Sequence, residues 1–154
     1  LLACAYRPSL LVLDEPSSGL DPIVRHDILG AIIRAIADEG RTVLFSSHLL
    51  DEVQRVADSF AMLHRGQILL NSSLEQALED HKKLIARFQN DIDGSAFPAV
   101  LMAQGSERDW TFIYNQSQER IEQAVLDRGG EIVEQTNVTL EEIFVARTSE
   151  AINV

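Results

Sequence analysis

Cysteine, lysine and long hydrophobic runs are scarce in this sequence. Its 154 residues include one cysteine, Cys4, which excludes an internal disulfide and is typical of a reducing compartment. No apolar run approaches the roughly 18 to 20 residues that a membrane-spanning helix needs, so we predict a soluble chain. The first residues also lack the basic segment followed by an apolar segment that marks a secretory signal.

Basic side chains are in the minority. The chain has 13 lysines and arginines against 24 acidic residues, a formal net charge of −11. A surface of this sign repels phosphate backbones and anionic lipids, which argues against nucleic acid or an acidic membrane surface as a direct partner.

A pair of acids follows a short apolar run near the start of the chain. The run Leu10–Leu13 lies between Pro8 and Pro16 and predicts a strand buried on both faces, as in parallel sheets. Asp14 and Glu15 come directly after it, at the carboxyl edge where open parallel sheets place their ligand sites. The pair predicts one group directed at magnesium and one base.

The elements predicted around this pair alternate between strands and helices. Asp21 is predicted to cap a helix that begins at Pro22 and ends at Gly40. Further strands are predicted at 42–46, 60–64, 67–70, 84–89, 110–114 and 132–136, and further helices at 49–57, 73–80, 118–128 and after Thr139. A loop is predicted at 90–98. The apolar positions predicted to form the core of the C-terminal part are Leu84, Ile85, Phe88, Trp110, Phe112, Ile132, Val133, Ile143 and Phe144.

Two segments carry a family resemblance. The sequence from Leu13 to Pro22, LDEPSSGLDP, resembles the Walker B strand and D-loop of ABC-type ATPases, and Thr42 to His48, TVLFSSH, resembles their switch-histidine strand. The implied fold is α/β: the C-terminal half of a RecA-like P-loop NTPase core of the ABC type, with a small α+β appendage. We place the ATPase part at residues 1–82 and the acidic appendage at residues 83–154.

The resemblance implies ATP and Mg²⁺ as cofactors and gives individual residues a role. Asp14 would bind Mg²⁺ through water, and Glu15 would be the general base that polarises the attacking water. His48 would hold that water and sense the γ-phosphate. Ser18, Gly19 and Asp21 belong to the loop that, in the family, faces the nucleotide across a head-to-tail dimer.

Other family motifs are absent from the sequence. The P-loop pattern of Gly, four residues, Gly-Lys and Ser or Thr does not occur, and the only lysines, Lys82 and Lys83, do not follow a glycine. The glutamine loop and the Ser-Gly-Gly signature are missing too. Leu1 to Arg7 resemble the end of the helix that follows that signature. We therefore expect a C-terminal fragment that is inactive by itself.

The leading functional hypothesis is the ATP-hydrolysing subunit of an ABC exporter. Residues Leu140 to Phe144, LEEIF, resemble the tail of such subunits. The implied partners are a second ATPase subunit, identical or different, and an integral membrane permease, with no nucleic acid. The implied location is the cytoplasmic face of the cell membrane.

Two alternatives belong to other functional classes. A soluble ABC ATPase acting on DNA or ribosomes would usually carry long coiled coils or basic inserts, and the chain has neither. A non-catalytic binding module is the other alternative, because half of the catalytic motifs are absent.

Overall fold

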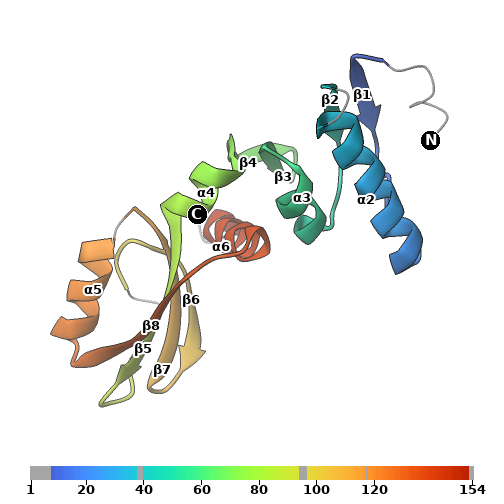
Figure 1. Ribbon diagram of the computed structural model, residues 1–154. Coiled ribbons are helices and arrows are strands. Elements are labelled where there is room, and N and C mark those ends of the chain that lie inside the picture. Colours follow the sequence, from blue (N-terminus) through green and yellow to red (C-terminus); the bar gives the residue numbers. More distant parts are fainter. Residues whose placement is uncertain (1–7, 38–39, 94–96, 117, 153–154) are drawn as a thin grey trace. The chain divides into compact units, whose positions relative to one another are not determined.

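The computed structural model describes residues 8–37, 40–93, 97–116 and 118–152, and it divides into two compact units between Ala57 and Asp58 (Figure 1). The prediction for Leu1 to Arg7, and Cys4 with it, lies outside the described residues. The boundary predicted between residues 82 and 83 falls inside a strand of the second unit, His81–Phe88. That boundary concerns where the ATPase-like sequence ends, and it stays a prediction.

The first unit is a two-stranded parallel sheet with two helices. Strand β1 pairs with strand β2 in the register Leu11↔Val43 and Leu13↔Phe45. Helix α2 is followed by the predicted C-cap glycine, Gly40 (φ +61°), whose N–H donates to the Ile36 carbonyl at 3.1 Å, while the Arg41 N–H donates to the Ala35 carbonyl at 3.2 Å. The bounds are β1 (Leu10–Leu13), α2 (Pro22–Ala37), β2 (Thr42–Phe45) and α3 (Leu50–Val56).

The prediction that β1 is buried on both faces is wrong. Leu11 is buried, but Leu10 and Val12 are 52% and 63% exposed. Leu44, which lies beside Val12 on β2, is 62% exposed. Successive side chains of a strand point to opposite faces, so among the described residues the packing partners of this sheet lie on the Leu11 side.

The second unit begins with a hairpin. Strands β3 (Ser59–His64) and β4 (Gln67–Ser73) are joined by Arg65 and Gly66, whose φ angles of +48° and +77° are those of a tight two-residue hairpin turn. Ser73 then caps helix α4 (Leu74–Asp80) by accepting a hydrogen bond from the Gln76 N–H at 3.2 Å.

A four-stranded antiparallel sheet of strand order β6-β7-β5-β8 forms the rest of the unit. Helices α5 and α6 lie on opposite faces of it (Figure 1). The bounds are β5 (His81–Phe88), β6 (Val100–Ser106), β7 (Asp109–Asn115), α5 (Gln118–Asp127), β8 (Gly130–Asn137) and α6 (Leu140–Ile152). Strand β6 was not predicted; the other strands and both helices were.

The core of the second unit fills the space between α5 and the sheet. Leu84, Phe88 and Phe112 are buried there, as predicted, beside Ile121 and Val125 of α5. On the opposite face, α6 buries Leu140, Ile143 and Ala146. Val133, predicted to be a core residue, is exposed. Within the described part of the chain, the helices lack the length and hydrophobicity needed to cross a bilayer.

Candidate functional site

The acid pair lies at the carboxyl edge of the parallel sheet. Asp14 and Glu15 follow the last residue of β1, and Ser46 follows the last residue of β2. The Ser46 N–H donates to the Leu13 carbonyl at 3.0 Å, which extends the pairing of the two strands to this edge. Parallel pairing therefore brings the residues after β1 and those after β2 together.

Ser46 connects the two acids. Its hydroxyl donates to Asp14 Oδ1 at 2.5 Å and accepts from the Glu15 backbone N–H at 2.8 Å. Glu15 has a φ of +44°, in the left-handed region, where a residue with a side chain is strained by about 1–2 kcal/mol. The hydrogen bond from its N–H to Ser46 helps to hold it in this conformation. Ser46 thus holds the carboxylate of Asp14 and the backbone of Glu15.

His48 lies against the second acid. Its Nδ1 is 2.7 Å from Glu15 Oε2. A carboxylate only accepts hydrogen bonds, so Nδ1 carries the proton and donates it. The structure thus brings Asp14, Glu15 and His48, three of the predicted site residues, to one place.

The predicted loop residues have a local role as well. Asp21 Oδ1 accepts from the backbone N–H groups of Ile23 and Val24 at 3.0 and 3.2 Å, which caps α2 as predicted. Gly19 has a φ of +71°, a conformation that favours glycine. Ser18 is exposed and its N–H donates to the Glu15 carbonyl at 3.1 Å. The described contacts of Asp21 are with α2 and not with the Asp14–Glu15–His48 cluster.

A buried polar network lies behind the cluster. The Ser17 hydroxyl donates to Glu52 Oε2 at 2.5 Å, and Arg25 Nε lies 3.3 Å from Glu52 Oε1. Ser17 and Glu52 are 0% and 2% exposed. Our sequence reasoning missed Glu52 and Arg25. Glu52 follows Leu49 at a spacing of three residues and precedes Val56 at four, so an acid within an apolar helical stripe was the available signal.

The donor set at the sheet edge can be compared with the needs of Mg²⁺. Among the described residues, no three His, Cys, Asp or Glu side chains gather into a metal cage. Mg²⁺ usually keeps several waters and binds through one or two carboxylates together with phosphate oxygens. Asp14 is exposed, and Ser46 engages its Oδ1. The edge therefore fits a hydrated Mg²⁺ shared with a phosphate and does not fit an ion held by protein alone.

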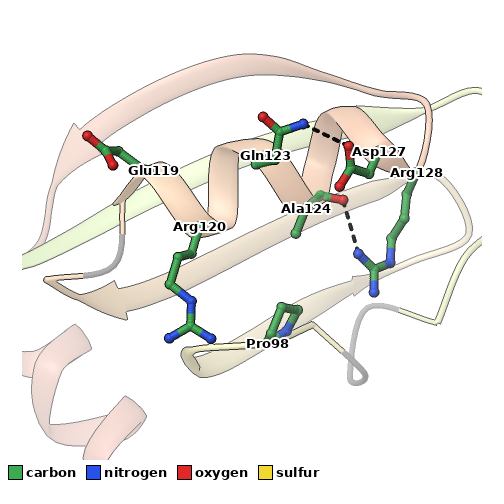
Figure 2. A pocket seen from close by; sticks show the side chains of 7 residues that line it. All are labelled: Pro98, Glu119, Arg120, Gln123, Ala124, Asp127 and Arg128. Carbon is green, nitrogen blue, oxygen red and sulfur yellow. Dashed lines mark hydrogen bonds between the residues drawn. The ribbon is translucent and has the colours of Figure 1, made fainter.

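A shallow hollow lies beside α5 in the second unit (Figure 2). Arg128 Nη1 donates to the Ala124 carbonyl at 3.1 Å, and the Arg128 guanidinium stacks over Phe97 at 4.6 Å from the ring centroid. Gln123 Nε2 donates to Asp127 Oδ1 at 2.7 Å. These polar groups bind one another and the core, so we assign no chemistry to this hollow.

Curated relatives agree with the motifs at the sheet edge. The chain is 25% identical over 148 residues to the ABC transporter ATP-binding protein YtrB of Bacillus subtilis (strain 168), a match that covers 96% of this chain and 51% of YtrB. It is 40% identical over 85 residues to the lantibiotic transport ATP-binding protein SrtF of Streptococcus pyogenes, covering 55% of this chain and 35% of SrtF. The chain is a relative of the ABC transporter ATP-binding proteins.

The match to these ABC relatives is partial, because the chain spans about half of the length of YtrB and less of SrtF. A solved structure of an ATP-binding subunit of an ABC transporter is 34% identical with a TM-score of 0.42, covering 47% of this chain and 30% of that one. The chain matches no protein-family model. The family prediction and the α/β class are confirmed; the roles of single residues stay predictions.

Proposed function

We propose that this chain is the C-terminal part of the ATP-hydrolysing subunit of an ABC transporter, and that the transporter is an exporter. The observation that carries the proposal is the 2.7 Å contact between Glu15 and His48, beside an Asp14 held by Ser46. An acid pair at the carboxyl edge of a parallel sheet, with a histidine on one acid, suits water attack on a phosphate.

Each residue of the cluster has a distinct task in this proposal. Asp14 binds the water shell of Mg²⁺, which neutralises charge on the phosphates when bound. Glu15 accepts the proton of the attacking water through its carboxylate. His48 donates from Nδ1 to Glu15 Oε2 and so holds that carboxylate, which leaves Nε2 to contact the water and the phosphate in this proposal.

The proposed site is completed by a P-loop that is not among these 154 residues. Asp14 and Glu15 act on phosphates that backbone N–H groups and a lysine already hold, and the sequence has no such motif. We therefore expect the 154-residue chain alone to bind Mg-ATP with no measurable affinity in calorimetric titration. Micromolar binding by this chain would contradict the proposed division of the site.

The transport context rests on the relatives. SrtF is named for lantibiotic transport, which supports a transporter subunit rather than a soluble ATPase; that the transport is export is our proposal. The proposed partners are a second ATPase subunit, which faces the loop of Ser18, Gly19 and Asp21, and an integral membrane permease. Binding to the permease places the subunit at the cytoplasmic face of the membrane. Co-purification with a permease from detergent-solubilised membranes tests this part.

The decisive experiment is Glu15→Gln in a subunit that contains these residues together with a P-loop. The amide keeps the size of the side chain but cannot accept the proton. Turnover should fall by about 10²–10⁴-fold while ATP still binds. Asp27→Asn, an exposed acid on α2, is the matched control and should leave turnover unchanged. Turnover of Glu15→Gln within about twofold of wild type would exclude Glu15 as the base.

A further inference from the structure

Two side-chain contacts join the segment that follows β1 to the segment that follows β2. Glu15 contacts His48 at 2.7 Å, and two residues further along the chain Ser17 donates to Glu52 at 2.5 Å. His48 and Glu52 are separated by the start of α3, whose first turn includes the Glu52 N–H bonded to the Leu49 carbonyl at 3.1 Å. Beyond the contacts of Ser46 with Asp14 and Glu15, the segment after β1 and the segment after β2 are therefore linked at two further points.

The two links differ in their exposure to water. Glu15 and His48 are accessible, so water and salt compete with their contact. Ser17 and Glu52 are buried, where a hydrogen bond to a charged carboxylate is stronger and water cannot replace it. The buried link is therefore the one best able to hold the spacing of the two segments against competition from water.

Glu52 also contacts the chain that follows the loop 18–21. Arg25 lies in the second turn of α2, and its Nε is 3.3 Å from the second oxygen of Glu52. The four residues 18–21 run between Ser17 and the start of α2, so one buried carboxylate anchors the chain before and after this loop. Burying a carboxylate is costly even when it is paired, which makes fold stability alone a weak reason to have it here.

We propose that Glu52 is a positioning residue for ATP hydrolysis: through Ser17 and Arg25 it sets the distance between Glu15 and His48 and the conformation of the loop 18–21. The inference rests on the proposed function of Glu15 and His48. Glu52 itself touches neither nucleotide nor water in this proposal, because it is buried behind the cluster.

The test uses the intact subunit and four variants. Glu52→Gln removes the charge that pairs with Arg25, and Ser17→Ala removes the hydroxyl that binds Glu52. Each should lower kcat by about tenfold or more, since misplacement of a catalytic group by about 1 Å can cost 10²-fold, while KM for ATP stays within about threefold. Ser17→Thr keeps the hydroxyl and should retain the wild-type kcat. Asp51→Asn, an exposed acid beside Glu52 on α3, is the matched control and should change neither constant.

A second measurement does not depend on catalysis. The N–H groups of Ser18 and Leu20 bond to the carbonyls of Glu15 and Ser17 at 3.1 and 3.4 Å. Glu52→Gln and Ser17→Ala should speed hydrogen exchange at these two amides but not in the second unit.

The variant that combines Glu52→Gln with Ser17→Ala tests whether the two residues act together. Its turnover should be no slower than that of the slower single variant, because both changes break one network.

Two outcomes would overturn the inference. Wild-type kcat and wild-type exchange in Glu52→Gln and Ser17→Ala would remove any positioning role. A loss of kcat with a matching loss of melting temperature and faster exchange throughout the first unit would give Glu52 a purely structural role. Failure of the proposed function is distinct from both: Glu15→Gln would then keep its turnover, whatever the exchange at Ser18 and Leu20.

Discussion

The two units of this chain are ordered by different interactions. The first unit buries few large apolar side chains, leaves Leu10, Val12 and Leu44 exposed, and concentrates its polar contacts at one sheet edge. The second unit covers its four-stranded sheet with α5 on one face and α6 on the other. All predicted site residues lie in the unit with the smaller core, and the unit with the larger core carries none of them.

This difference indicates how each unit responds to substitution. In the first unit, side chains such as Ser46 and Glu52 set geometry, so a substitution there should act on turnover. In the second unit, side chains such as Phe112 fill space, so a substitution there should act on the free energy of unfolding. Four substitutions test this contrast. The sole tryptophan, Trp110 of β7, reports the unfolding of the second unit in the 154-residue chain.

Phe112→Ala should give the largest effect. Phe112 is fully buried between α5 and the sheet and packs against the tilted ring of Phe97 at a centroid distance of 4.4 Å. Its truncation should lower the free energy of unfolding of the second unit by about 3–5 kcal/mol, measured by urea titration with Trp110 fluorescence. Val133→Ala on exposed β8 surface is the control, with a change within about 0.5 kcal/mol. Equal effects of the two variants would contradict the described core.

His48→Ala should act on turnover and not on stability. In the intact subunit we expect a turnover about 10²-fold lower, because Glu15 loses the donor that fixes its carboxylate. The melting temperature should stay unchanged, since the imidazole is exposed. His26→Ala, an exposed histidine of α2, is the matched control. A large fall in melting temperature with unchanged turnover would make His48 a structural residue.

Thr139→Ala should have a smaller effect than Phe112→Ala or His48→Ala. Thr139 and Glu142 form a reciprocal capping box at the start of α6: the Glu142 N–H donates to Thr139 Oγ1 at 3.2 Å, and the Thr139 N–H donates to Glu142 Oε2 at 2.8 Å. Loss of the hydroxyl should lower the free energy of unfolding by about 1 kcal/mol in the Trp110 urea assay. Thr139→Ser keeps the hydroxyl and should be near wild type. If both variants were equally unstable, the methyl group and not the cap would matter.

Local chemistry explains which parts of this structure the sequence predicts. The predicted cap at Asp21 is confirmed, and the turn at Arg65-Gly66 and the capping box at Thr139 likewise depend only on neighbouring residues. Strand β6 contains Ala103, Gln104 and Gly105, which have little β propensity, so periodicity did not mark it. Strand β6 forms because it pairs with β7. This pairing requires a glycine at position 105, since a Cβ there would collide with the Asp109 carbonyl oxygen.

Local sequence likewise predicts only part of the candidate site. The acids and the histidine follow apolar runs and stand out in the sequence, and the structure brings them together. Neighbouring residues assign no functional role to Ser17 or Glu52. Their contact joins residues 35 positions apart, which no local pattern encodes. The exposure of Leu10 and Val12 likewise depends on what packs against the sheet and not on the strand itself.

The smallest expected effect is a pH dependence of the second unit that arises from His81. This side chain is buried where α4 meets β5; its Nδ1–H donates to the Ala77 carbonyl at 2.7 Å, and Arg147 donates to its Nε2 at 3.0 Å. Burial lowers the pKa of His81 below 6.5, the Arg147 cation lowers it further, and the Ala77 hydrogen bond and Asp80 oppose these effects. A proton on Nε2 would displace the hydrogen bond from Arg147 and place two cations together.

The sign of this dependence follows from the lowered pKa of the folded state. Above pH 6.5 the imidazole is neutral in both states and the stability of the unit is fully present. As the pH falls below 6.5 the unfolded chain takes up the proton first, so stability is lost until the pH passes the lower pKa of the folded state. The urea midpoint reported by Trp110 should therefore decrease as the pH is lowered from 7.5 to 5. His81→Gln should reduce this decrease, whereas His26→Gln should leave it unchanged. A wild-type pH profile in His81→Gln would assign the dependence to the carboxylates of the unit instead.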